Sequence, residues 1–431
     1  MNLKEHLNQA SPDQLQHWKQ ELTAEYQAFQ NQSLNLDLTR GKPSAEQLCL
    51  SDSLDGILSG TYTTANGTDV RNYGGLDGID EIKQLGAEIL GVADNEVLAA
   101  GNSSLTLMYQ AVMHAYLFGF SGPESAWKNK AEIKFLCPVP GYDRHFTICE
   151  QLDIEMLTVP MTPEGPDMDK VERLIQTDSS IKGMWCVPKY SNPTGVIYSN
   201  QVVERIARLG KVSSPNFRVF WDNAYAVHDL VDEPPQLANI MNYARAYGTE
   251  NQIIQFTSTS KITYAGAGVA FMASSEKNLA SFKEALAACT IGPDKVNQLR
   301  HAKLLPDMDV LRAHMKKHAT LIKPRFDIVL THLEQAFGSS TLGQWNTPMG
   351  GYFISFDTRP GLAKKIVQLA AEAGVKLTPA GATFPYGEDP QDKNIRIAPT
   401  VPSVAQLDTA MRVFVNCVKL ASVQQEISRR D

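Results

Sequence analysis

The strongest constraint on this fold is an alternation of short apolar runs with helical patterns between about residues 95 and 273. Six runs are apolar enough to be buried on both faces: Ile133–Cys137, Ile154–Val159, Gly183–Val187, Arg218–Trp221, Ile253–Phe256 and Gly268–Ala273. Helical patterns such as Leu105–Phe118 and Gln201–Lys211 separate most of them. Buried strands that alternate with helices predict an α/β domain with a mostly parallel, doubly wound sheet.

The rest of the chain predicts a smaller α/β unit and a polar N-terminal segment. The expected elements are a long charged helix at Asp309–Phe337, a strand at Gly351–Phe356, a helix at Leu362–Ala373 and a C-terminal helix from about Val404. Near the N-terminus, Ser11, Pro12 and Gln14 have the spacing of a helix cap. We expect residues 59–305 to form a large domain, residues 306–431 a small domain, and residues 1–58 to pack with the small domain.

Composition argues against several classes of protein. With 40 basic and 47 acidic residues, the net charge is −7 and there is no basic run, so neither nucleic acid nor an anionic membrane is expected as main partner. No stretch is apolar and long enough to span a bilayer, and Met1–Ala10 is polar where a secretory signal would be apolar. Six scattered cysteines show no CxxC spacing. We expect a soluble, reduced, cytoplasmic protein.

One histidine pair has the spacing of metal ligands. His314 and His318 lie four residues apart on the long predicted helix. The residues between them include no carboxylate, so we predict no metal site and place both rings on a solvated helix face.

The residues that follow the predicted strands are the candidates for a functional site. In doubly wound sheets, ligands bind where the parallel strands end. Four segments follow such strands: Pro138–Asp143, Pro188–Gly195, Asp222–Tyr225 and Thr257–Lys261. We expect their polar side chains to converge on one crevice.

Lys261 is the residue on which a functional interpretation depends most. It follows a predicted strand and the four hydroxyl residues Thr257–Ser260. In partly apolar surroundings its amine could be neutral enough to attack the carbonyl carbon of an aldehyde cofactor, and later to carry a proton. The alternative is a lysine at a helix start whose charged end reaches solvent, which is the commoner use of a single lysine after a strand.

Asp222 and Tyr225 follow another buried strand. The Asp222 carboxylate could pair with a pyridinium nitrogen and keep that ring an electron sink. Tyr225 could donate a hydrogen bond to a phenolic oxygen on the same ring. The alternatives are a helix N-cap for Asp222 and an ordinary half-buried aromatic for Tyr225.

Two further features suit anions. Gly101–Ser104 precede a helical run, so backbone N–H groups and the hydroxyls of Ser103 and Ser104 could bind phosphate, although serine at this position is mostly a cap. Arg396 lies between apolar neighbours in Asn394–Ala398 and needs an anion if it points inward. A substrate carboxylate or an internal Asp or Glu would serve equally.

These features occur in the order and spacing of one family. The chain resembles the pyridoxal-phosphate-dependent aminotransferases of fold type I, class I, and more narrowly the MocR-like branch of aspartate aminotransferases that lack a DNA-binding domain. The resemblance extends from about Leu36 to Val418 and is carried by Leu38–Ser44, Asn192–Gly195, Asp222–Tyr225 and Ser258–Lys261. It implies a large domain with a mostly parallel sheet and a smaller α/β domain.

The resemblance also implies the residues that bind the pyridine ring. Lys261 would hold pyridoxal 5′-phosphate covalently and move the proton between the substrate Cα and the cofactor. Asp222 would pair with the pyridine nitrogen, while Asn192 and Tyr225 would bond the phenolic oxygen.

Anion binding and assembly follow from the same resemblance. Ser103, Ser104 and Ser258 would bind the phosphate. Tyr73 matches a tyrosine that reaches the phosphate of the other subunit, which implies a homodimer with shared active sites. Arg396 matches the arginine that binds the substrate α-carboxylate.

Two positions depart from the family pattern. The family places a phosphate-binding arginine eight residues after the lysine, where this chain has Val269. Many relatives carry the aromatic that stacks on the cofactor at the position of Val139, and Tyr142 is the candidate substitute.

The expected reaction moves an amino group from an amino acid, with aspartate favoured, to a 2-oxo acid such as 2-oxoglutarate. Gly41 lies in the N-terminal loop that closes over the substrate. The cation for the aspartate side chain could be Arg40 or Lys42 in that loop, or Lys295 or Arg300.

Two other functions remain open at this point. The first is another reaction of the same cofactor, such as β-elimination or decarboxylation. The second is a non-catalytic sensor, since aminotransferase-like domains also serve in transcription regulators. Such regulators carry a basic winged helix ahead of the domain, whereas only some 35 acidic to neutral residues precede the loop that contains Arg40 here.

Overall fold

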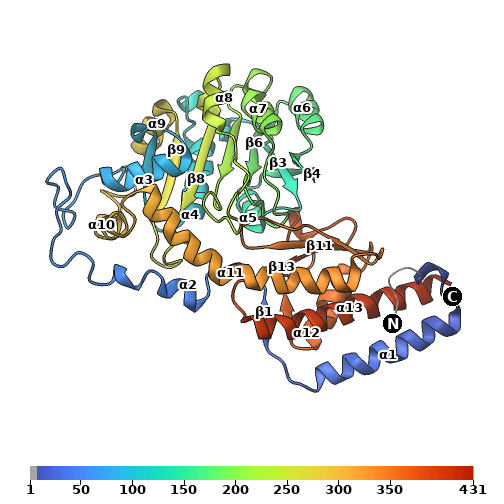
Figure 1. Ribbon diagram of the computed structural model, residues 1–431. Coiled ribbons are helices and arrows are strands. Elements are labelled where there is room, and N and C mark those ends of the chain that lie inside the picture. The colour runs from blue at the N-terminus through green and yellow to red at the C-terminus, as the bar shows by residue number, and fades with distance from the viewer. Residues whose placement is uncertain (1–6, 431) are drawn as a thin grey trace.

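Two lobes that share one long helix make up the computed structural model, which describes residues 7–430 (Figure 1). The helix is α11 (Met308–Phe337), as Asp309–Phe337 predicted, and Asp307 caps it by accepting a hydrogen bond from the backbone N–H of Val310. Leu311 near its start packs with the large lobe, whereas Val329 and Leu333 pack with the small lobe. The helix therefore belongs to both apolar cores.

An eight-stranded sheet forms the large lobe, in the order β2-β9-β8-β7-β6-β3-β4-β5. Its parallel strands are β4 (Glu155–Thr162), β3 (Lys134–Val139), β6 (Ile181–Cys186), β7 (Arg218–Asp222) and β8 (Ile253–Ser258). Three strands run antiparallel to a neighbour: β9 (Ala270–Ser274), β2 (Val97–Ala99) and β5 (Gly165–Pro166). The prediction of a mostly parallel sheet is confirmed.

Helices cover both faces of this sheet, because adjacent strand residues point to opposite sides. On one face, a cluster that includes Phe220 packs with α4 (Ser104–Leu117), α5 (Asp143–Gln151) and α9 (Glu276–Leu286). On the other, the next residue, Trp221, packs with α6 (Met168–Thr177), α7 (Asn200–Arg208) and α8 (Ile240–Tyr247). Near β9, a further cluster is covered by α3 (Asp80–Leu90) and α10 (Lys295–Leu304).

The small lobe combines two short sheets with helices. Its three-stranded antiparallel sheet has the order β10 (Gly343–Trp345), β11 (Ile354–Thr358) and β13 (Asn394–Ile397). The helices are α12 (Ala363–Glu372) and α13 (Val404–Arg430), and α1 (Pro12–Gln30) packs along α13 (Figure 1). In addition, β1 (Leu36–Leu38) pairs in parallel with β12 (Val375–Leu377), so the N-terminal segment completes this lobe.

The N-terminal segment crosses to the large lobe before residue 59. After α2 (Ala45–Cys49), Leu58 is buried in the cluster formed by α3 and α10. The domain boundaries at 58/59 and 305/306 stay predictions. No helix between residues 7 and 430 combines the length and the apolar character needed to cross a membrane.

The strands β2 and β5 were not expected from the sequence. They are three and two residues long. Segments this short show no periodic pattern of apolar residues in the sequence, and they are stabilised by pairing with β9 and β4.

Candidate functional site

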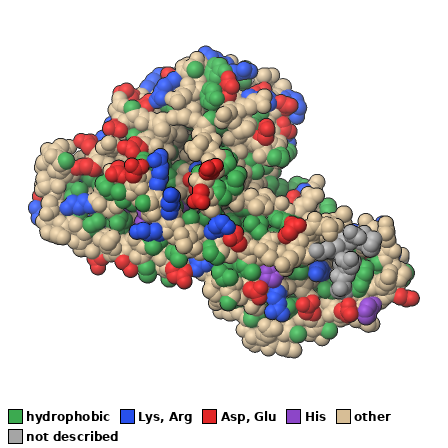
Figure 2. Space-filling model, viewed as in Figure 1, with side chains coloured by type: hydrophobic (Ala, Val, Ile, Leu, Met, Phe, Trp, Pro, Cys, Tyr) green, Lys and Arg blue, Asp and Glu red, His purple; other side chains and the backbone are tan. Residues whose placement is uncertain are grey.

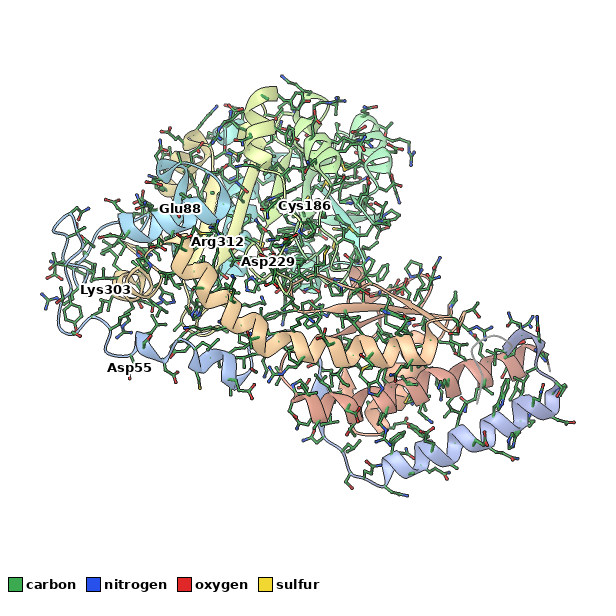
Figure 3. All side chains as sticks on the ribbon, viewed as in Figure 1. Asp55, Glu88, Cys186, Asp229, Lys303 and Arg312 are labelled. Carbon is green, nitrogen blue, oxygen red and sulfur yellow. The ribbon has the colours of Figure 1, made fainter. Side chains whose placement is uncertain are left out.

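Strand order reverses between β3 and β6, which is the point in a doubly wound sheet where the sequence predicts the site. From β3 the chain continues outward to β4, whereas from β6 it continues in the other direction to β7 and β8. The connections that follow β3 and β6 diverge, which leaves room at the carboxyl ends of the strands. Figure 3 labels Cys186 at the end of β6 and Asp229 after β7, the latter just above α11 in this view. Acidic and basic side chains gather where the two lobes meet (Figure 2).

Asp222 ends β7 and has one satisfied and one unsatisfied oxygen. Its Oδ2 lies 3.0 Å from Nε2 of His145, and both side chains are buried. The other oxygen, Oδ1, is buried with no hydrogen-bond partner. A buried carboxylate oxygen without a donor is costly, so this atom indicates a missing ligand group.

His145 is a site residue that the sequence analysis missed. Its ring stacks on Trp185, with centroids 4.3 Å apart and planes 7° apart, so its orientation is held. The signal that could have found it is its position three residues after Tyr142, on the first turns of α5. Residues three apart on a helix share a face.

Two lysines at this edge differ in their partners. The Nζ of Lys189 lies 2.7 Å from Oδ1 of Asp229. The Nζ of Lys261 makes no hydrogen bond or ion pair within residues 7–430, and lies 5.3 Å from the ring centroid of Tyr225. Burial lowers the pKa of Lys261 below its ordinary value, and the Asp222 carboxylate opposes only part of this effect. That direction favours the neutral, nucleophilic amine.

The predicted tyrosines lie around the same carboxylate. Tyr225 is buried, and burial together with the nearby Tyr142 and Asp222 raises its pKa, so its hydroxyl stays a donor. Tyr142 contacts the His145 ring edge-on, with centroids 4.9 Å apart. These contacts bring Tyr142, Tyr225 and Lys261 around Asp222, as their positions after separate strands predicted.

The predicted phosphate residues lie where α4 begins. Ser103 is the N-cap residue of α4, but its hydroxyl makes no capping hydrogen bond. Ser258 Oγ lies 3.1 Å from Ser260 Oγ, and Ser260 Oγ donates to the backbone carbonyl of Asn102 at 3.0 Å. This last bond joins the segment after β8 to the start of α4. Free N–H groups at a helix start and free hydroxyls together can bind an anion.

Arg396 points inward from β13 and is 6% exposed. Its Nη1 lies 3.0 Å from Oδ1 of Asp143 and 3.2 Å from Oδ1 of Asn192, and its Nε donates to Thr378 Oγ1 at 3.3 Å. The guanidinium also lies over the Phe353 ring, 4.8 Å from the centroid. The structure thus contains the internal ion pair that the sequence left open, in a place where a substrate carboxylate could compete with Asp143.

The N-terminal loop lies over this arginine. Hydroxyl groups of the small lobe donate to the carbonyl oxygens of Thr39 and Lys42, each at 2.8 Å. At Gly41, an added Cβ would lie 2.5 Å from Cζ of Phe353, so only glycine lets the loop approach so closely. Arg40 is exposed beside it.

Two other candidate cations and Tyr73 lie elsewhere. Lys295 is buried, and its Nζ donates to the carbonyl oxygens of Asn72 and Gly74 at 2.8 and 2.5 Å, which holds that loop. Lys295 is therefore engaged by backbone, and Arg300 is exposed on α10. Tyr73 is 84% exposed, next to the loop that Lys295 holds.

The structure corrects one expectation from the sequence and explains one departure. The prediction that His314 and His318 lie on a solvated face is wrong: they are 6% and 1% exposed, because α11 packs against the segment that carries Lys261. No cluster of metal-ligating side chains occurs among the described residues. Val269, at the position of the family's phosphate arginine, is buried in the cluster around β9.

Comparisons with known proteins agree with this architecture. A family model described as aspartate amino-transferase matches residues 10–430. The chain is 45% identical over 406 residues to an aspartate aminotransferase of Corynebacterium glutamicum, covering 94% of both chains. It superposes on a crystal structure of an aspartate transaminase from that organism with a TM-score of 0.93 and 44% identity, over 97% and 99% of the two chains. An α-aminoadipate aminotransferase from Thermus thermophilus, crystallised with a phosphopyridoxyl-leucine, shares the fold at a TM-score of 0.73 and 20% identity, over 95% of each chain.

Proposed function

The chain belongs to the aspartate aminotransferase family, and from this premise we propose that it binds pyridoxal 5′-phosphate and moves an amino group from aspartate to 2-oxoglutarate. The single observation that carries the proposal is the unpaired Lys261 amine at the same strand edge as the unpaired Oδ1 of Asp222. A pyridoxal ring requires both an amine for its aldehyde and an acid for its ring nitrogen.

The residues present suit this cofactor. Asp222 Oδ1 is a buried acceptor that lacks a donor, and a protonated ring nitrogen would supply one. His145 would hold the carboxylate through Oδ2. The hydroxyls of Ser103 and Ser104 at the start of α4, together with that of Ser258 at the end of β8, would bind the phosphate, and Tyr225 and Asn192 the phenolic oxygen. The hydroxyls and the N-terminus of α4 would balance the negative charge of the phosphate. Val269, which stands where the family has an arginine, has no charge to do so.

Bound pyridoxal phosphate supplies an electron sink that stabilises negative charge at the substrate Cα. Lys261 would then carry the proton to and from that carbon, a step that its lowered pKa favours. Arg396 would bind the α-carboxylate in the planar fork that now faces Asp143 and Asn192. Buried Tyr225 and half-buried Tyr142 would keep water from the reacting atoms.

Aspartate as donor requires a second cation. Arg40 is the candidate that the geometry favours, because it is unpaired and follows Thr39 in the loop above Arg396. Lys295 is engaged by backbone carbonyls. Substitution of Arg40 by Ala is expected to raise KM for aspartate and leave KM for alanine unchanged.

Assembly and location complete the proposal. Exposed Tyr73 would reach the phosphate of a second subunit, which makes the working form a homodimer with shared active sites. The protein would act in the cytoplasm. Analytical ultracentrifugation tests the dimer, and a monomer with full activity would contradict it.

The visible absorption spectrum tests the proposed function. With pyridoxal phosphate bound, addition of L-aspartate should replace the visible band with the near-ultraviolet band of the aminated cofactor, and 2-oxoglutarate should restore it. A band that aspartate does not change would contradict the substrate, and release of pyruvate and ammonia would indicate β-elimination. No band at all would contradict the role of Lys261.

A further inference from the structure

A group of histidines surrounds the backbone that carries Lys261. Four of them contact the segment Lys261–Thr263: His228, His301, His314 and His318. All four are buried. Their hydrogen bonds reach carbonyl oxygens and the Thr263 hydroxyl rather than the Lys261 amine. The His228 ring also contacts the Tyr225 ring edge-on, with centroids 5.6 Å apart, so the group borders the candidate site.

Two consecutive carbonyl oxygens each lie within hydrogen-bond distance of two side chains. The carbonyl oxygen of Lys261 lies 3.3 Å from Nε2 of His228 and 3.4 Å from the hydroxyl of Tyr352. The carbonyl oxygen of Ile262 lies 2.8 Å from Nε2 of His314 and 2.9 Å from Nε2 of His318. Such saturation by side chains is unusual, because most buried carbonyls pair with backbone.

The surroundings of His318 determine which of its ring nitrogens carries the proton. Burial lowers the pKa of His228 to about 3 and of His318 to about 4, so both rings are neutral at pH 7. A carbonyl only accepts, so the proton of His318 lies on the Nε2 that faces Ile262, and this N–H also lies 3.1 Å from Nε2 of His314. Nδ1 of His318 then accepts from Gln47 Nε2 at 3.1 Å, and the same amide donates to the Tyr352 hydroxyl at 3.0 Å.

The network joins four separate parts of the chain. His228 follows β7, His314 and His318 lie on α11, Tyr352 precedes β11, and Gln47 lies on α2. Gly351 N–H donates to the carbonyl oxygen of His228 at 2.9 Å, which ties the small lobe to the same place.

We propose that Gln47, His228, His314, His318 and Tyr352 are positioning residues that set the place of the Lys261 amine by holding the carbonyl oxygens of Lys261 and Ile262. A lysine side chain has four rotatable bonds, and the Lys261 amine makes no hydrogen bond or ion pair within residues 7–430, only contacts with the faces of Tyr225 and Tyr352. Its reach to the reacting carbon therefore depends on where its Cα is held, and a small displacement is costly for catalysis. The inference rests on the proposed function, since position matters only if this amine reacts.

Substitutions at His318 test the proposal in the full-length protein. His318→Phe keeps the ring but removes the donor to Ile262, whereas His318→Gln places an amide N–H near Nε2. We expect His318→Phe to lower kcat about tenfold with KM for aspartate within twofold, and to weaken pyridoxal phosphate binding severalfold by absorbance titration. His318→Gln should restore most of both values.

A second variant and a control make the result decisive. Tyr352→Phe removes one hydroxyl and should lower kcat severalfold without loss of folding by circular dichroism, so it decides the matter if His318→Phe fails to fold. His114→Phe changes a histidine equally buried on α4, bonded to Ser281, and should leave kcat and cofactor binding unchanged.

Several outcomes would overturn the inference. These are unchanged kcat and cofactor affinity in folded His318→Phe or Tyr352→Phe, an equal loss in His114→Phe, or no recovery with His318→Gln. Failure of the proposed function is distinguishable, since the wild-type protein would then show neither a visible band with pyridoxal phosphate nor amino transfer.

Discussion

The side chains at the carboxyl ends of the strands and the backbone that carries Lys261 differ in how their polar atoms are satisfied. On the crevice side, the Lys261 amine, Asp222 Oδ1 and the Ser103 hydroxyl make no hydrogen bond within residues 7–430. In the backbone of the segment that carries Lys261, the carbonyl oxygens of Lys261 and Ile262 each lie within hydrogen-bond distance of two side chains. Lys261 belongs to both groups, the first through its amine and the second through its carbonyl oxygen.

This difference distinguishes the groups that would bind a ligand from the groups that hold the backbone in place. Folded proteins rarely leave buried polar groups unpaired, because each costs about 1–3 kcal/mol. Unpaired groups that lie at one strand edge therefore indicate where a ligand completes the bonds. Saturated carbonyls indicate where the backbone must not move.

The largest effect is expected from removal of the unpaired amine. Lys261→Ala should lower amino transfer by about 10⁴-fold, because covalent cofactor binding and proton transfer both depend on this group. The melting temperature should not fall, since no hydrogen bond is lost. Lys189→Ala is the matched control: it breaks the ion pair with Asp229 and should lower the melting temperature but keep the visible band. Equal losses of activity in both variants would contradict the different roles assigned to Lys261 and Lys189.

A smaller loss is expected at the unpaired carboxylate. Asp222→Asn keeps the shape and removes the charge that would face a ring nitrogen, so kcat should fall by about 10²–10³-fold. Chemical denaturation should give nearly the same free energy of unfolding, because Oδ1 makes no bond to lose. A large loss of stability would instead assign Asp222 a structural role with His145.

The saturated side should respond to pH. The pKa values of His228 and His318 are lowered to about 3 and about 4, below an unfolded value of about 6.5. At a pH between the folded and the unfolded values, the unfolded chain therefore binds more protons than the folded protein. The free energy of unfolding should therefore fall as the pH drops below 6.5, by about 1.4 kcal/mol per unit for each histidine. His318→Gln should lose one such contribution, as urea denaturation at pH 5 and 7 can measure. If the free energy of unfolding of His318→Gln changed with pH as much as that of the wild type, His318 would not be a buried, neutral histidine.

The smallest effect compares two serine N-caps. Ser11 accepts from the backbone N–H of Gln14, so Ser11→Ala should cost about 1 kcal/mol of stability. The Ser103 hydroxyl makes no cap, so Ser103→Ala should cost almost none. It should, however, weaken binding of pyridoxal phosphate severalfold by absorbance titration. A stability loss equal to that of Ser11→Ala would show that Ser103 is only a cap.

Site residues could be predicted where chemistry follows directly from position along the chain. Lys261 and Asp222 follow strands that are apolar throughout, and parallel strands end at one edge, so their proximity could be expected. The inward direction of Arg396 could be expected as well, from its apolar neighbours in β13. Its partner Asp143 could not, because the two are 253 residues apart and meet only when the lobes pack.

Residues whose role depends on long-range packing escaped prediction. His145 matters because β6 places Trp185 beneath its ring and β7 places Asp222 beside it. His314 and His318 have polar neighbours on a charged helix, a pattern typical of a solvated face. They are buried because another part of the chain covers that face.

By itself, the sequence determined the doubly wound sheet, the long helix of residues 308–337, the capped first helix and the strand-end residues Lys261 and Asp222. These depend on local periodicity and on the rule that parallel strands end together. Only the tertiary structure decided which polar atoms are left without partners and which are saturated. Hydrogen bonding in the interior is settled by groups that are distant in sequence, and no local pattern records which of them will meet.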